Sequence, residues 1–208
     1  MAPTHATCPG DADNSYGDMP IALPGRIEAE DFDIDGYSDT TVNNEGGAYR
    51  TNTAVDVKDI EGGFAVGWTA PSEWLEYTVN VETEGDYEVF IRAGSPDSGN
   101  HTLRIVQCDT VLISEFKAPR VSNWDTFKTI SAGTVRLTPG VQVIRIETGA
   151  TANLHLDWVH IGPYDGPVDT IENGEPGNYP KGNPPVPSAG CGTDGRSSLL
   201  AGGQGVSG

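Results

Sequence analysis

Hydrophobic and polar residues alternate in short runs through the middle of the chain, from residue 23 to residue 164. In the run over 73–81, alternation places Leu75 and Tyr77 on one face of a strand. Runs of the same kind cover 86–92, 101–107, 126–137, 141–148 and 153–161. Gly-containing turns separate the runs, and no stretch shows a helical period. The pattern predicts an all-β protein, an antiparallel β-sandwich of the jelly-roll type.

The two ends of the chain differ from this middle region in composition. Residues 1–22 are polar, and residues 165–208 are rich in Gly and Pro, with Tyr179 as the only aromatic residue. Such segments bury too little apolar surface to offset the entropy of ordering them. We therefore expect an N-terminal polar tail over 1–22, a sandwich domain over 23–164 and a linker over 165–208. A linker of this kind is typical of a larger, modular protein.

The charge of the chain excludes several classes of partner. Asp and Glu number 30 against 12 Lys and Arg, which gives a formal net charge of −18. Because phosphate groups bind to basic surfaces, this composition argues against a nucleic acid or an anionic membrane as partner. No apolar run is long enough to span a bilayer. We expect the domain to be a monomer.

The three cysteines, at positions 8, 108 and 191, lack the spacing of a zinc site. Cys108 falls in an apolar strand pattern, so we expect a buried thiol there. Cys8 and Cys191 lie in the two tails. A disulfide that joins the tails and a pair of free thiols both fit the sequence, because spacing alone does not fix the pairing.

The common catalytic motifs are missing: the chain has no G-x-S-x-G, no H-E-x-x-H, no phosphate-binding loop and no dinucleotide fingerprint. Carboxylates are numerous, however, and two of them suffice for glycoside hydrolysis. The sequence therefore favours a binding protein. A catalytic jelly-roll glycosidase or lyase fragment is the alternative.

Acidic residues offer two candidate calcium sites. The segment Asp31-Phe-Asp-Ile-Asp-Gly36 opens like an EF-hand loop, but its twelfth position is Val42 instead of the required Glu. Glu28 and Glu30 leave the same face of an early strand, and Asp157 lies in the last strand. First and last strands commonly meet in a sandwich, and three convergent carboxylates need a hard cation. A solvated sheet edge is the alternative.

Aromatic residues offer candidate sugar-binding sites, because a flat ring packs against the apolar C–H face of a pyranose. Trp74 alternates with Glu76 on the face opposite Leu75 and Tyr77. Packing under a loop is the alternative for this residue. Trp124 lies in a loop just before a strand, which favours a ligand role.

The last run, 153–161, divides into two faces by alternation. Leu154, Leu156 and Trp158 share one face, so we expect Trp158 in the core. Asn153 and His155 share the other face, where two hydrogen-bonding groups suit the hydroxyl rim of a sugar. An exposed strand residue without a ligand is the alternative for His155.

Six motifs follow one another in the middle region. They are Arg26-Ile-Glu-Ala-Glu-Asp-Phe32, Gly46-Gly-Ala-Tyr-Arg50 with Val55-Asp-Val57, Phe64-Ala-Val-Gly-Trp68, Glu73-Trp-Leu-Glu-Tyr-Thr-Val-Asn-Val81, Asn123-Trp-Asp-Thr-Phe127 and Leu156-Asp-Trp-Val-His-Ile161. In this order they resemble the family 6 carbohydrate-binding modules, over about residues 25–163. The resemblance implies a non-catalytic β-jelly-roll that binds polysaccharide and is attached to a secreted glycoside hydrolase.

The resemblance also implies a structural calcium and a main cleft. The calcium ligands of the family match Glu28, Glu30 and Asp157. The cleft lies in loops at one end of the sandwich, where two aromatic residues hold a sugar. These aromatic residues match Trp68 and Trp124.

Other positions of the family pattern are less regular in this chain. The amide of the main cleft matches His155, so the hydrogen bond to the sugar falls to His155 or Asn153. Asp56, expected to face outward, and Tyr49 are further candidates. A second cleft, on the concave sheet face, matches Trp74 with Glu76 beside it.

The ligand that the resemblance implies is a β-linked polysaccharide. The motif over 46–50 with Val55-Asp-Val57 resembles members attached to agarases and laminarinases. This favours agarose or β-1,3-glucan, and xylan or cellulose also fit the family. The expected partners are this glycan and a covalently linked catalytic domain, and the expected location is extracellular. A domain that binds a protein through its Trp residues is a further alternative.

Overall fold

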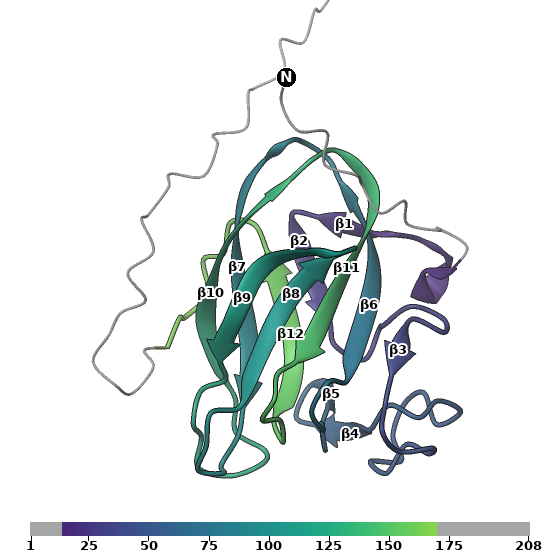
Figure 1. Cartoon of the computed structure of the whole chain (residues 1–208), viewed down its shortest axis with the longest axis vertical. Coiled ribbons are helices and arrows are strands. Elements are labelled where there is room, and N and C mark those ends of the chain that lie inside the picture. Colours follow the sequence, from purple (N-terminus) through teal and green to yellow (C-terminus); the bar gives the residue numbers. More distant parts are fainter. Residues whose placement is uncertain (1–13, 170–208) are drawn as a thin grey trace, which may run out of the picture.

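The computed structural model describes residues 14–169, which form two β-sheets packed face to face (Figure 1). Residues 1–13 and 170–208 lie outside the described part. The elements are the 3₁₀ turn η2 (Tyr16–Asp18) and the strands β1 (Ile21–Leu23), β2 (Gly25–Glu28), β3 (Tyr37–Ser38), β4 (Val57–Ile60), β5 (Gly63–Val66), β6 (Trp74–Val81), β7 (Gly85–Gly94), β8 (Thr102–Gln107), β9 (Thr110–Lys117), β10 (Lys128–Leu137), β11 (Gly140–Thr148) and β12 (His155–Ile161). Within this part, no helix has the length and apolar composition needed to span a membrane.

Each sheet contains six strands, and strands distant in sequence lie side by side. Sheet A has the order β1-β6-β11-β8-β9, with β3 also on β6. Sheet B has the order β10-β7-β12-β5-β4, with β2 also on β12. All pairs are antiparallel except β1 with β6. The prediction of an antiparallel β-sandwich is confirmed.

The core fills the space between the sheets, because alternate residues of each strand point inward. Tyr77 and Val79 of sheet A are fully buried against Val89 and Ile91 of sheet B in one cluster. The hydroxyl of Tyr77 donates to the carbonyl of Ala29 at 2.9 Å, which satisfies the one polar group of this core ring. The alternation expected for the runs over 73–81 and 86–92 is correct.

Trp158 is buried, but it lies outside this core cluster, where the alternation had placed it. Leu156 of β12 is opposite Ala93 of β7, whereas Trp158 is opposite Arg92, so Asp157 is one extra residue in β12. Such a β-bulge reverses the inward and outward order of the residues that follow it. Trp158 consequently lies on the outer face of sheet B.

Cys108 is not the buried strand thiol that the pattern predicts. It lies in the exposed turn between β8 and β9 with a φ of 53°, and it is disulfide-bonded. The prediction was wrong because β8 ends at Gln107, and the chain turns back into β9 at Cys108 and Asp109. The other two cysteines, Cys8 and Cys191, lie outside the described residues.

Residues near both predicted domain boundaries contact the sandwich. The segment assigned to the polar tail contains η2 and the start of β1, and the carbonyl of Asn14 accepts a hydrogen bond from Ile34 at 2.8 Å. At the other end, residues 162–169 continue past β12 across the outer face of sheet B. The division into 1–22, 23–164 and 165–208 itself stays a prediction.

Candidate functional site

Four rings meet at the end of the sandwich where β12 begins. The ring of His155 lies 4.7 Å from Trp124 and 5.7 Å from Trp68, between ring centroids, with planes tilted by 36° and 39°. Phe127 lies 6.4 Å from the same ring. Trp124 and Phe127 belong to the loop before β10, and Trp68 follows β5. The structure thus brings the predicted residues Trp68, Trp124 and His155 together.

His155 is a buried residue with a defined hydrogen-bonding pattern. Its Nδ1 bonds the main-chain carbonyl of Trp124 at 2.9 Å, and because a carbonyl only accepts, Nδ1 carries the proton. Burial lowers the pKa of His155, and the hydrogen bond to Trp124 opposes this effect. The neutral ring therefore has its lone pair on Nε2. A Cβ added at Gly67 would lie 2.7 Å from Nε2, so Gly67 leaves room beside this acceptor.

The loop that contains Trp124 is held by a neighbouring strand. Lys58 of β4 donates to the carboxylate of Asp125 at 2.6 Å and to the carbonyl of Trp124 at 3.5 Å. The bond and charge of Lys58 lower the pKa of Asp125. The two charges beside the rings therefore balance each other.

Trp68 is the exposed member of the group, with 45% of its surface open to solvent. Its φ of 47° lies in the left-handed region, which large residues seldom adopt and which is common at functional sites. A Cβ added at Gly46 would lie 3.0 Å from the indole of Trp68. The loop around Gly46 therefore passes directly against this ring.

Asn153 lies next to the ring group, and its side-chain amide nitrogen is bonded within the protein. Its main-chain N–H donates to the carbonyl of Thr69 at 2.7 Å, which ties it to the residue after Trp68. Its side-chain Nδ2 donates to the carboxylate of Asp97 at 2.5 Å. The amide nitrogen is therefore occupied within the protein.

Asp56 is buried, with 1% of its surface exposed, whereas the alternation predicted that it faces outward. Its Oδ1 accepts a hydrogen bond from the main-chain N–H of Glu45 at 2.5 Å. Burial raises its pKa to about 6, against this hydrogen bond, and the nearby carboxylates of Asp39, Glu45 and Glu73 raise it further. Asp56 precedes β4 and fixes the 44–57 loop from inside.

Tyr49 belongs to a different aromatic group. Its ring lies 4.6 Å from Phe64 and 5.9 Å from Tyr16, between centroids. Its hydroxyl donates to the carboxylate of Asp31 at 2.7 Å. These contacts attach the 44–57 loop to the N-terminal segment.

Trp74 lies on the outer face of sheet A, where an arginine covers its ring. The guanidinium carbon of Arg145 is 4.1 Å from the Trp74 ring centroid. Arg145 also donates to the Glu76 carboxylate from Nε at 2.9 Å and from Nη2 at 2.6 Å. The expected second cleft thus contains a cation–π and ion-pair contact within the protein.

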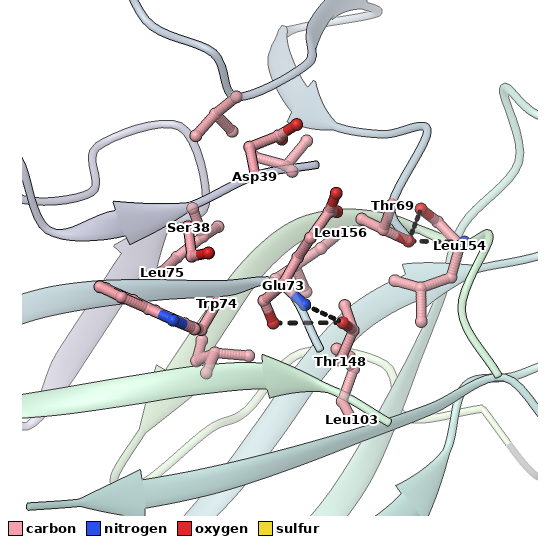
Figure 2. A pocket seen from close by; sticks show the side chains of 13 residues that line it. Ser38, Asp39, Thr69, Glu73, Trp74, Leu75, Leu103, Thr148, Leu154 and Leu156 are labelled. Carbon is pink, nitrogen blue, oxygen red and sulfur yellow. Dashed lines mark hydrogen bonds between the residues drawn. The ribbon is translucent and has the colours of Figure 1, made fainter. Parts of the chain in front are cut away.

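A small cavity lies where β6 begins, between the two sheets (Figure 2). Apolar side chains line it, and Glu73 lies at its polar side. The Glu73 carboxylate accepts hydrogen bonds from the N–H of Thr40 at 2.9 Å and of Ala70 at 2.7 Å. The cavity has a volume of about 20 Å³, which admits one water and no sugar ring.

The three predicted calcium ligands are near one another without forming a complete cage. Glu30 is buried, and its Oε2 has no hydrogen-bond partner. Burial raises its pKa to about 8, helped by the charges of Asp31, Glu28 and Asp157. Asp157 pairs with Arg92 at 2.5 Å, however, and in residues 14–169 no three metal-binding side chains converge. Glu30 fits a cation site on its unpartnered oxygen, whereas Asp157 would have to share its carboxylate with Arg92.

Comparison with known proteins adds to this geometry. A family model described as "Carbohydrate binding module (family 6)" matches residues 30–163, more than half of the chain. The chain belongs to this family. It is a non-catalytic family 6 module, similar to modules within glycoside hydrolases.

Relatives of this family 6 module occur in several enzymes. A β-agarase, AgaO of Microbulbifer thermotolerans, is 27% identical over 139 residues, which is 65% of this chain and 11% of the agarase. The C-terminal family 6 module of LamC, a marine laminarinase of Zobellia galactanivorans, has a TM-score of 0.54 at 22% identity, covering 67% of this chain and 98% of that one. A β-1,3-glucan-binding family 6 module of Bacillus halodurans has a TM-score of 0.51 at 19% identity, covering 69% and 99%.

A further relative shows a bound sugar. A family 6 module of Clostridium stercorarium, solved in complex with cellobiose, has a TM-score of 0.53 at 17% identity and covers 70% of this chain and 98% of that one. Relatives of this family 6 module therefore bind oligosaccharides and are parts of larger enzymes.

Sequence reasoning missed three residues that shape the ring group: Lys58, Asp125 and Phe127. Asp125 and Phe127 flank Trp124 in the motif over 123–127, so their proximity had a sequence signal. Lys58 had none, because it reaches the loop from a strand more than sixty positions earlier.

Proposed function

We propose that this module binds a neutral β-linked polysaccharide through Trp68, Trp124 and His155. Agarose or a β-1,3-glucan is the favoured ligand, and xylan or cellulose is the alternative. The observation that carries the proposal is the exposed indole of Trp68 beside a second indole and a neutral, hydrogen-bonding imidazole. Similarity to a β-agarase supports agarose, and likeness in fold to a β-1,3-glucan-binding module keeps the glucan among the candidates.

Charge supports a neutral sugar over an acidic one. Lys58 and Asp125 neutralise each other beside the rings, so the site presents no free cation to a carboxylate or sulfate. The chain as a whole has a formal charge of −18, which repels a polyanion at moderate ionic strength.

The roles of the residues follow from their chemistry. The indole faces stack on the C–H face of a pyranose, at about 1–2 kcal/mol per ring. Nε2 of His155 accepts a hydrogen bond from a sugar hydroxyl, and the side-chain oxygen of Asn153 is a second acceptor. A shallow, wet surface of this kind gives affinities of about micromolar to millimolar.

Weak binding becomes effective when the module is tethered to a catalytic domain. We propose a module over 23–164, joined by the segment 165–208 to a glycoside hydrolase, whose local concentration on the polysaccharide it raises. The disulfide at Cys108 supports an oxidising, extracellular location. The formal charge of −18 is consistent with a soluble monomer.

We also propose a structural calcium beside β2 and β12. The unpartnered oxygen of Glu30 supports it, because a buried carboxylate needs a proton or a cation. Glu28 and Asp157 are the neighbouring carboxylates that would complete the donor set. A bound calcium would offset the mutual repulsion of the three charges.

Affinity electrophoresis of the chain in agarose, laminarin, xylan and cellulose derivatives tests the site. We expect one glycan to retard the protein, and we expect Trp68→Ala to abolish the retardation. Because Trp68 is half-exposed, its removal leaves the core intact. Trp74→Ala is the matched control, since its ring is covered by Arg145.

Three outcomes contradict the proposal. Retardation lost only in Trp74→Ala would move the site to sheet A. Release of reducing ends from the glycan would favour the catalytic fragment. A folded protein that no glycan retards would favour a protein partner instead.

A further inference from the structure

The segment 162–169, here called the strap, covers the outer face of sheet B. Gly162 donates to the carbonyl of Glu88 in β7 at 2.8 Å. The ring of Tyr164 lies 4.9 Å from Phe90 and 5.7 Å from Trp158, between centroids. The strap therefore buries the two outward aromatic residues of β7 and β12 and crosses toward β10.

The strap ends in a two-point contact with β10. Thr129 donates its main-chain N–H to the carboxylate of Asp169 at 2.8 Å, and the N–H of Asp169 donates to the carbonyl of Thr129 at 2.6 Å. Because β10 is the edge strand of sheet B, these main-chain groups point away from β7. Asp169 thus gives hydrogen-bond partners to main-chain groups of this edge strand that would otherwise have none in the sheet. Arg92 of β7 is opposite Thr129 on the other side.

Thr129 is the second residue of β10, the strand that directly follows the Trp124 loop (residues 121–127). Phe127 at the end of this loop lies 5.1 Å from the guanidinium of Arg92 and 6.4 Å from the ring of His155. The far end of the loop is fixed by Val121, whose N–H donates to the carbonyl of Ser95 at 3.1 Å. The C-terminal end of the loop runs into the start of β10, where Asp169 bonds Thr129.

We propose that Asp169 is a positioning residue for the Trp124 loop. Its two bonds hold the first residues of β10 in place beside β7. They thereby set where Phe127 and Trp124 lie relative to His155. The strap then links the outer face of sheet B to the ring group at the end of the sandwich. The effect on glycan binding rests on the proposed function, whereas the effect on the loop does not.

Hydrogen–deuterium exchange and affinity electrophoresis of the full chain test this role together. In Asp169→Ala we expect faster amide exchange confined to residues 121–130. We expect glycan affinity to fall about threefold to tenfold, the range for the loss of one typical hydrogen bond. Asp169→Asn keeps an oxygen that accepts from Thr129 and should restore both values. Asp165→Ala, an exposed change of the same charge in the strap, is the matched control.

The proposal is overturned if Asp169→Ala leaves exchange over 121–130 unchanged, or if Asp165→Ala has the same effect. It is also overturned if faster exchange spreads equally through β6 and β7, because Asp169 would then stabilise the whole fold. If the parent chain binds no tested glycan, the proposed function fails. The exchange comparison still decides whether Asp169 positions the loop.

Discussion

The Nδ1 atom of His155 donates to the main-chain carbonyl of Trp124 at 2.9 Å, which joins the first residue of β12 to the loop before β10. Lys58 reaches the same carbonyl from β4, at 3.5 Å. One backbone oxygen is thus bonded from two strands of sheet B. This arrangement fixes the tryptophan and assigns the tautomer of the histidine.

Stability should depend on pH through His155. Burial lowers its pKa below the usual value of about 6.5, so the unfolded chain takes up this proton first as pH falls. The free energy of unfolding should therefore decrease as pH falls from about 7 toward the lowered pKa, and His155→Leu should lack this component. Urea unfolding at pH 7.5 and 5.5 measures the difference. An equal pH slope in parent and variant would show that His155 does not contribute.

Through Asp56, the free energy of unfolding should change with pH in the opposite direction. Its pKa of about 6 lies above the unfolded value near 4, so ionisation on raising the pH from 4 to 6 destabilises the folded state. Asp56→Asn keeps an oxygen for the N–H of Glu45 and removes the charge. We expect it to stabilise the protein by about 1–3 kcal/mol at pH 7 and to have little effect near pH 4.

Asp59→Asn is the control for that experiment, because Asp59 is an exposed carboxylate of the adjacent strand β4. It removes the same charge without relieving burial. If both variants stabilise the protein equally at pH 7, general repulsion between acidic groups is responsible, and burial of Asp56 is not.

Alternation of residues was enough to predict the sandwich and most of its long strands. It misassigned Trp158, because a single bulged residue, Asp157, reverses the order of faces, so that Val159 and Ile161 point into the core in place of Trp158. It misassigned Cys108 because β8 ends one residue before it, and the chain turns at Cys108 and Asp109. Both errors arise where the backbone departs from regular strand geometry.

The candidate site was predictable to a smaller degree. Trp68, Trp124 and His155 followed from the family motifs, since these keep residues at fixed places in the fold. Asp56 is buried, and the guanidinium of Arg145 covers the ring of Trp74, through contacts between segments that are distant in the sequence. Such contacts have no local pattern, so the sequence did not show that both side chains were already occupied.

The cover on Trp74 can be tested directly. Arg145→Ala removes the guanidinium from the ring, so we expect tryptophan fluorescence to become more accessible to acrylamide quenching. The loss of partly exposed ion pairs should cost about 0.5–1 kcal/mol of stability. Glycan affinity should not change, because the ring group lies elsewhere. If Arg145→Ala creates a second binding event in calorimetry, the Trp74 face is a latent site closed by this arginine.

Removal of calcium should destabilise the protein through Glu30, since its buried Oε2 has no partner within the chain. Adding millimolar Ca²⁺ to chelator-treated protein should raise the unfolding temperature, in proportion to RT ln(1 + [Ca²⁺]/Kd). Glu30→Gln should lose this dependence while staying folded, because a neutral amide removes the cost of burying a charge. Glu61→Gln, an exposed change in the turn between β4 and β5, should keep the full calcium response. Calorimetric scans with Ca²⁺ and with chelator measure all three proteins. The proposal fails if neither Ca²⁺ nor chelator changes the unfolding temperature of the parent chain. Glu30 would then be held neutral by a proton, and the ion pair of Asp157 with Arg92 would stand where the metal was expected.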